Sequence, residues 1–272
     1  MLPWTSYEAM SAAARLQPES FWLEAAQRIT WKQPPATACR TRPDGWHDWF
    51  AGATLNTCHN AVDRHVESGR AGQAALVWHS CATQEQQTIT YGVLQGRVAG
   101  FAGGLRALGV EKGDRVLISM PTMIETAIAM LACARLGAVH VVVFAGYAGQ
   151  ELAQRIDDVT PKVIITASCS FHGRTAISSI PALGQALTAA SHAPLACIVL
   201  HRAACMAKLL PGRAYDFHPS ELAIPAAPLS VMAEDPLHIL HTPPTTGKPK
   251  GIVRDNFGNA GALARPIDRM ST

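Results

Sequence analysis

The sequence predicts an α/β protein in which helices flank a parallel sheet. Short apolar runs at 115–120, 139–144, 162–166 and 197–200 have the length and composition of strands. Segments with the spacing of helices lie between them, and this alternation is typical of βαβ units. The run at 139–144 is almost continuously apolar, so we expect that strand to be buried on both faces.

Composition indicates a folded globular chain of one or two domains. Of its 272 residues, 48% are hydrophobic and 16% charged, and the net charge is only +3. So slight a charge predicts neither nucleic-acid nor membrane-surface binding, and no run reaches the about 18 apolar residues of a membrane helix. The N-terminus lacks the layout of a signal peptide. Seven cysteines without a C-x-x-C pair predict free thiols in the cytoplasm and no metal site.

The first 84 residues form the predicted N-terminal helical and turn-rich segment. Residues 5–14 have helix-forming composition, and Pro18 opens a second helix that extends to Thr30. An aromatic, turn-rich stretch follows, and within it Asn56, His59 and Asp63 form a polar cluster. A hydrogen-bond network at a helix start is the preferred interpretation of this cluster, and a polar site is the alternative.

The residue pattern from 74 to 109 predicts a β-hairpin followed by a helix. Strand-like runs at 74–78 and 87–90 flank a polar turn. Thr90 is a natural N-cap, and apolar side chains recur from Leu94 to Leu108 with the period of one buried helix face. Gly109 is placed to end this helix.

The rest of the predicted domain, from 85 to 272, continues the strand–helix alternation. Further helices are expected at 123–136, 150–158 and 183–190, the first of them ending at Gly137. Residues 211–235 are rich in Pro, Ala and charge, which predicts a surface connection back to the sheet. A brief helix is expected after Asn256.

The segment from Leu240 to Gly251 combines groups that bind phosphate oxygens. Thr245 and Thr246 offer hydroxyl and N–H donors, Gly247 allows close approach, and Lys248 and Lys250 carry positive charge. The segment is no Walker A loop, because Thr242 and Pro249 stand where that motif needs Gly and Ser or Thr. A strand, a polar loop and a short strand at 251–254 are predicted, and a solvated hairpin tip is the plain alternative.

The stretch Thr245-Thr246-Gly247-Lys248-Pro249-Lys250-Gly251 resembles the phosphate-binding loop of adenylate-forming enzymes, the acyl-CoA synthetase superfamily. Its continuation Ile252-Val253-Arg254-Asp255-Asn256 is similar to the propionyl-CoA and acetyl-CoA synthetase branch. Residues 113–140 and 153–158 share this resemblance, and so does the segment around Asn56 to Arg64. The resemblance extends from about Phe21 to Leu263. The resemblance implies the incomplete N-terminal domain of an adenylate-forming enzyme, ending just after the phosphate-binding loop.

The resemblance also implies a reaction and its site residues. A small carboxylate, propionate or acetate, would attack ATP, and coenzyme A would displace AMP from the acyl-adenylate. Thr242, Thr245, Thr246, Gly247, Lys248 and Lys250 would hold the ATP phosphates, while Gly146 and Arg174 would contact coenzyme A. The family's Mg²⁺-binding glutamate, adenine site, carboxylate pocket and catalytic lysine have no match before Thr272, so the catalytic residues are unassigned.

Two departures from the family bear on activity. Pro243 and Pro244 replace the family's usual Ser-Gly, and Ala145 replaces the first glycine of its coenzyme A turn. Together with the shortness of the chain relative to the family, these two departures favour a truncated and inactive ligase fragment. The alternatives are a non-catalytic remnant with weak nucleotide or anion binding, and an unrelated nucleotide-binding module. Oligomeric state and the choice between propionate and acetate are left open.

Overall fold

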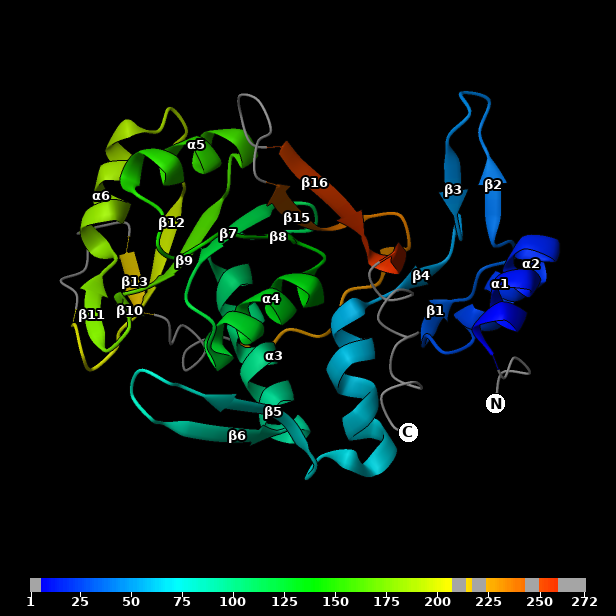
Figure 1. The fold of residues 1–272 in the computed structure, drawn as a ribbon, viewed down its shortest axis with the longest axis horizontal. Coiled ribbons are helices and arrows are strands. Elements are labelled where there is room, and N and C mark those ends of the chain that lie inside the picture. The colour runs from blue at the N-terminus through cyan, green and yellow to red at the C-terminus, as the bar shows by residue number, and fades with distance from the viewer. Residues whose placement is uncertain (1–5, 207–213, 217–223, 243–249, 259–272) are drawn as a thin grey trace.

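A central seven-stranded sheet organises the computed structural model, which describes residues 6–206, 214–216, 224–242 and 250–258. Six strands are parallel, whereas the edge strand β16 is antiparallel to β15. The predicted α/β class is therefore confirmed, but the sheet is mixed rather than wholly parallel (Figure 1). Its strands, in spatial order, are β13 (Ala214–Asp216), β12 (Ala196–Leu200), β9 (Val163–Ala167), β7 (Arg115–Ser119), β8 (Val139–Val142), β15 (Pro236–Thr242) and β16 (Lys250–Asp255).

Helices cover both faces of this sheet (Figure 1). On one face lie α3 (Tyr91–Ala107) and α4 (Ile124–Leu136), and on the other α5 (Gly149–Val159) and α6 (Ile180–Ala189). The Thr90 hydroxyl accepts the Val93 N–H and so caps α3, as predicted. Gly137 ends α4 at φ +71°, a left-handed conformation that its lack of Cβ permits.

Several predicted boundaries differ from those observed. Strand β8 ends at Val142, so Phe144 lies outside it and is 69% exposed. Helix α2 (Pro18–Ala26) ends four residues before Thr30, and α6 begins at Ile180 instead of 183. An unpredicted hairpin of β10 (Cys169–His172) and β11 (Thr175–Ser178) follows β9. The side chains of this hairpin are polar or of mixed burial, so the sequence shows no alternating apolar pattern that would predict its strands.

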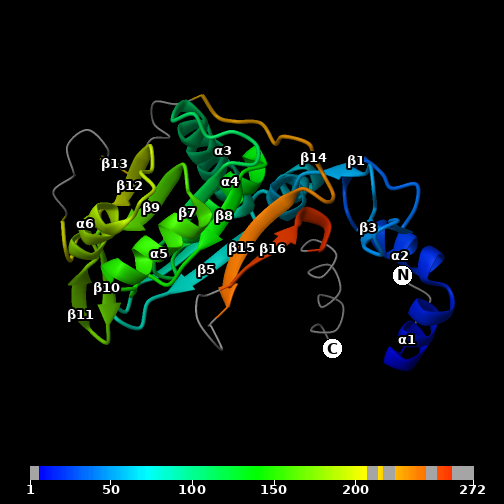
Figure 2. The same ribbon diagram turned by 90° about the horizontal axis from the view of Figure 1, so that it is seen from above.

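The N-terminal part packs beside the sheet (Figure 2). Helix α1 (Tyr7–Leu16) precedes α2. The polar cluster begins at Asn56, just before the π-helical segment η1 (His59–Asp63), and ends at Asp63, the last residue of η1. The remaining elements here are β1 (Trp31–Gln33), β2 (Cys39–Thr41), β3 (His47–Trp49), β4 (Thr54–Leu55), η2 (Val66–Arg70), β5 (Ala74–His79) and β6 (Gln86–Thr90). Strands β5 and β6 form the predicted hairpin.

The connection at 211–235 is exposed over much of residues 224–235, as predicted, but two of its described stretches belong to sheets. Residues 214–216 are the sheet strand β13, and β14 (Val231–Met232) pairs with β4. Ala233 is buried with Phe50 and Phe257, whose ring centroids lie 3.9 Å apart. The segment thus joins the N-terminal part to the strand that follows it. The helix expected after Asn256 lies largely outside the described residues.

A buried histidine in the sheet gives stability a pH dependence. His140 of β8 pairs in register with His238 of β15, and its Nδ1 has no hydrogen-bond partner. Burial, aided by the charge of His238, lowers the pKa of His140 from 6.5 to about 3. Below pH 6.5 the unfolded chain therefore binds a proton that the folded chain rejects.

We expect the free energy of unfolding to fall by about 1.4 kcal/mol for each pH unit below 6.5 on account of His140. Urea unfolding of the wild type and of His140→Val, between pH 7.5 and 5, measures this effect as a difference of slopes. The exposed His47→Gln is the control and should follow the wild type. Parallel curves for wild type and His140→Val would contradict the prediction.

Candidate functional site

A cavity of about 640 Å³ opens at the carboxyl edge of the parallel strands. From β7 the chain crosses to β8 on one side, and from β9 it crosses to β12 on the other, so β7 and β9 flank a switch point of the topology. Ligands of open α/β sheets bind at such points. The cavity is lined by the segments that follow β7, β8 and β9: Met120–Thr122, Val142–Tyr147, Ser170–His172 and Ile177–Ser179, with Ala182.

Aromatic side chains dominate the wall that follows β8. The rings of Phe144 and Tyr147 meet edge to face, with centroids 5.8 Å apart. A Cβ on Gly146 would lie 2.5 Å from the Phe144 ring, so glycine leaves the space that the ring occupies. The buried Arg155 of α5 stacks on Tyr147, 5.2 Å from the ring centroid. The wall therefore offers flat apolar surface backed by a cation.

The two residues proposed for coenzyme A lie on neighbouring segments. Gly146 lines the cavity. Arg174 is exposed in the turn between β10 and β11, beside Gly173 at φ +59°. His172 and Ile177 of the same hairpin line the cavity, whereas Arg174 is not among the lining residues. The structure thus brings Arg174 to the hairpin that borders the cavity, with its charge in solvent.

The hairpin of β15 and β16 holds the two ends of the predicted phosphate-binding segment. Thr242 and Lys250 are paired and exposed, and the Thr242 hydroxyl donates to the Lys250 carbonyl oxygen at 3.4 Å. Because β15 runs parallel to β8 with Ile239 opposite Val141, Thr242 lies at the carboxyl edge of the sheet. Thr245, Thr246, Gly247 and Lys248 lie outside the described residues.

A hydrogen-bond contact not anticipated from the sequence fixes this hairpin to α5. The Nε2 of His241 lies 2.8 Å from Oδ2 of Asp158, and the His241 side chain is only 5% exposed. Gly251 stands opposite His241, and a Cβ there would lie 3.0 Å from Ile239. Asp158 and His241 are 83 positions apart. The local sequence around His241, a strand pattern in which threonine follows the histidine, does not indicate that Asp158 is its partner.

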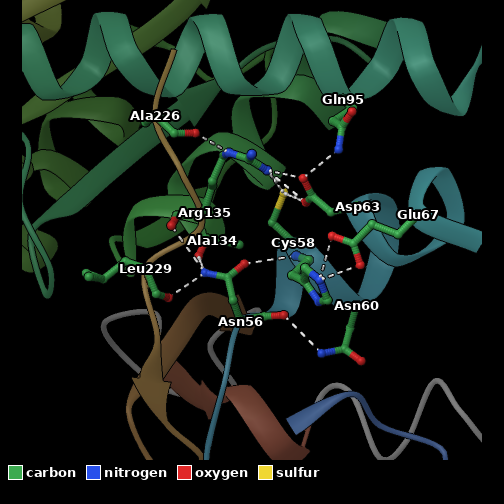
Figure 3. A network of polar contacts seen from close by, with 11 residues as sticks. Asn56, Cys58, Asn60, Asp63, Glu67, Gln95, Ala134, Arg135, Ala226 and Leu229 are labelled. Atoms are coloured by element: carbon green, nitrogen blue, oxygen red, sulfur yellow. Dashed lines mark hydrogen bonds and ion pairs between the residues drawn. The ribbon is translucent and has the colours of Figure 1, made fainter. Parts of the chain in front are cut away.

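The polar cluster at 56–63 is a buried hydrogen-bond network, which settles the two interpretations in favour of structure (Figure 3). Asn56 Oδ1 accepts the His59 N–H at 2.9 Å, as an N-cap does. Its Nδ2 donates to the carbonyl oxygens of Ala134, Arg135 and Leu229. Three distant segments are thereby joined at one side chain.

An ion pair between Asp63 and Arg135 lies at the centre of this network (Figure 3). The two groups are 2.8 Å apart, and their side chains are 5% and 6% exposed. Gln95 donates to Asp63, and Arg135 Nε donates to the Ala226 carbonyl oxygen at 2.6 Å. Burial raises the pKa of the adjacent Cys58 thiol to about 12, which makes it unreactive. Most of the polar groups of this network are thus bonded to one another.

The described residues contain no cluster of three or more His, Cys, Asp or Glu side chains able to hold a metal ion. Within the same ranges, no helix is both long and apolar enough to cross a membrane.

Two family models match the chain. The model of AMP-binding enzymes matches residues 62–271, and that of the acetyl-coenzyme A synthetase N-terminus matches residues 7–61. The two matches meet at residue 61, and the β5–β6 hairpin spans residue 84. The division predicted at residue 84 stays a prediction.

Curated relatives include short-chain ligases. The chain is 48% identical to an uncharacterized Pseudomonas aeruginosa protein, of which it covers 41%. It is 40% identical to the propionate–CoA ligase of Salmonella typhimurium over 93% of this chain and 41% of that one. It is 38% identical to the human mitochondrial acyl-CoA synthetase short-chain family member 3, over 95% of this chain and 38% of that one. The chain thus spans about two fifths of the length of these relatives.

A solved structure shows the same fold. The acetoacetyl-CoA synthetase from Streptomyces lividans matches with a TM-score of 0.86 at 24% identity, over 97% of this chain and 40% of that one. Since the AMP-binding model covers well over half of the sequence, the chain belongs to the AMP-binding enzyme family.

Proposed function

We propose that this chain is the nucleotide-binding part of a short-chain acyl-CoA ligase, which joins propionate or acetate to coenzyme A and converts ATP to AMP and diphosphate. The observation that carries the proposal is the shared edge of the sheet: the ends of the phosphate-binding segment and the 640 Å³ cavity both lie at the carboxyl ends of the strands. The relatives named as propionate–CoA ligase and short-chain acyl-CoA synthetase support this reaction class.

In this proposal the β15–β16 hairpin binds the ATP phosphates. The hydroxyls of Thr242, Thr245 and Thr246 donate hydrogen bonds, and Lys248 and Lys250 neutralise charge on the phosphates. Gly247 lets the backbone approach. Both Thr242 and Lys250 are exposed, so a ligand can reach them from solvent, and the Thr242 hydroxyl would exchange its bond to the Lys250 carbonyl oxygen for one to phosphate. Mg²⁺ would enter with ATP, since the described residues supply no carboxylate cluster for it.

Coenzyme A occupies the cavity in this proposal. Phe144 and Tyr147 present ring faces on which a base can stack, and Gly146 leaves room for the Phe144 ring. Arg174, exposed in the turn of the β10–β11 hairpin that borders the cavity, would attract the phosphates by its charge. The exposure of Phe144, at 69%, supports this role, because a large ring exposed in a cavity is a stacking surface.

Two measurements on the 272-residue chain test the proposal. We expect ATP to bind, and we expect Lys250→Met to weaken that binding about 10-fold, the effect of one charge-assisted contact. The exposed Lys32→Met is the matched control. We expect no carboxylate-dependent exchange of pyrophosphate into ATP, because the chain spans only 41% of the propionate–CoA ligase. Absence of ATP binding would overturn the nucleotide site, and robust exchange would overturn the inactivity of this fragment.

A second candidate is a non-catalytic protein with weak nucleotide or anion binding. The exposed apolar side chains of the hairpin favour it: Leu240 is 49%, Ile252 43% and Val253 55% exposed. Dye binding to this surface, together with weak ATP binding, would support it. In either case no disulfide joins the seven cysteines, all of which the structure describes, and this supports a reducing compartment, with the cytoplasm as our proposal.

A further inference from the structure

The end of the β15–β16 hairpin extends beyond the ladder that joins β15 to β8. That ladder stops at the pair of Ile239 with Val141. The residues past this point are here called the hairpin tip, in which Leu240 pairs with Ile252, His241 with Gly251 and Thr242 with Lys250. The described backbone pairing of the tip is therefore with β16, the edge strand of the sheet in the described ranges. Side-chain contacts must help to set where the tip lies.

A hydrogen bond between His241 and Asp158 joins the hairpin tip to the last turn of α5 (Figure 1). Nε2 of His241 lies 2.8 Å from Oδ2 of Asp158. The histidine side chain is 5% exposed and the aspartate side chain 51% exposed. Because an ionised carboxylate only accepts hydrogen bonds, Nε2 is the donor. The bond thus connects a buried ring of the tip to a helix that packs on the sheet.

Gly251 leaves the space in which this hydrogen bond forms. A Cβ at Gly251 would lie 3.6 Å from Oδ2 of Asp158 and 3.7 Å from Nε2 of His241. The same Cβ would lie 3.0 Å from the Ile239 side chain, which is closer than ordinary packing allows. A larger side chain at this position would therefore press on the strand and on both partners of the bond.

We propose that Asp158 and His241 are positioning residues, whose hydrogen bond holds Thr242 and Lys250 where they meet the phosphates of ATP. This inference rests on the proposed nucleotide site, and neither Asp158 nor His241 contacts ATP in it. Thr242 follows His241 in the chain and pairs with Lys250, so a displacement of His241 moves both. Groups that are held in place before the ligand arrives avoid the cost of being ordered by it.

The charge of Asp158 and its hydrogen bond have opposite effects on ATP binding, and this difference makes the inference testable. A negative charge near the phosphates weakens binding, so removal of the charge alone would tighten it. Loss of the bond to His241 would weaken binding. Asp158→Asn and Asp158→Ala remove the same charge, but asparagine keeps an oxygen that can accept from Nε2.

Titration calorimetry with ATP on the 272-residue chain compares these variants. We expect Asp158→Ala to raise the Kd about 3–10-fold, the effect of one hydrogen bond, and Asp158→Asn to keep the wild-type Kd or lower it. His241→Ala should match Asp158→Ala, and the double variant should bind no more weakly than either, since both act through one bond. Glu151→Ala, the same charge change in the exposed first turn of α5, should behave as the wild type.

Hydrogen exchange without ATP measures the contact independently of the nucleotide. In Asp158→Ala we expect the amides of the hairpin tip to exchange about 3–10-fold faster than in the wild type. Those of the central strand β7 should keep their protection, which shows that the variant is folded. Unchanged exchange in the tip would overturn the positioning role.

The outcomes separate the positioning role from the site on which it depends. If the wild type binds no ATP, the proposed nucleotide site is wrong, and the positioning role with it. If the wild type binds ATP and Asp158→Ala binds it equally or more tightly, the nucleotide site stands and the positioning role is wrong. If Asp158→Asn and Asp158→Ala weaken binding by the same factor, the hydrogen bond is not the cause, which also overturns the inference.

Discussion

Replacing Pro243 with Ser and Pro244 with Gly is expected to tighten ATP binding by about 10²–10⁴-fold. Proline has no N–H and a φ fixed near −65°, so the pair removes two backbone donors from the segment between Thr242 and Lys250. Ser and Gly supply two N–H groups, one hydroxyl and access to positive φ. Two restored hydrogen bonds to charged phosphate, at about 1.5–3 kcal/mol each, give the expected range.

A second variant separates the two physical causes. Pro243→Ala with Pro244→Ala restores both N–H groups but neither the hydroxyl nor the freedom of glycine, so it should recover part of the gain. Calorimetric Kd values for ATP measure both variants, and Lys250→Met in the Ser-Gly background should reverse much of the effect. Unchanged affinity in the Ser-Gly variant, with its thermal unfolding preserved, would show that these backbone groups do not contact phosphate.

Removing the Asp63 carboxylate is expected to destabilise the fold by about 3–5 kcal/mol, as the loss of one partner from a buried ion pair does. Asp63→Ala leaves the Arg135 guanidinium buried at 6% exposure beside an empty site. It also leaves Gln95 without its acceptor. Burial lowers the pKa of Arg135, but the hydrogen bonds and charges of Asp63 and Cys58 together more than offset this, so the pKa of Arg135 is raised.

Urea unfolding of three variants tests the ion pair. Asp48→Ala breaks the surface pairs with Arg40 and Arg42, whose side chains are 68% and 47% exposed, and should cost under about 1 kcal/mol. Asp63→Leu combined with Arg135→Met removes both charges and should recover much of the loss seen in Asp63→Ala. Equal, small effects for Asp63→Ala and Asp48→Ala would contradict the central role of the buried pair.

The polar cluster shows how far a sequence can be interpreted. Asn56 before His59 matched a helix N-cap, and the cap is present. No local pattern indicated that the Asn56 amide also donates to the carbonyl oxygens of Ala134 and Leu229, because those partners are 78 and 173 positions away. Capping is local, whereas the partner of a buried donor is set by packing.

By itself the sequence determined the α/β class, the strand–helix alternation of the central sheet from β7 to β12, the caps at Thr90 and Gly137, and the family. Each depends on residues within a few positions of one another, through periodicity, turn chemistry and a motif. The tertiary structure alone decided that the segments after β7, β8 and β9 enclose one cavity, that Asp158 binds His241, and that a second pocket shares Phe171 with this cavity. These contacts join residues far apart in the chain, and strand order brings them together.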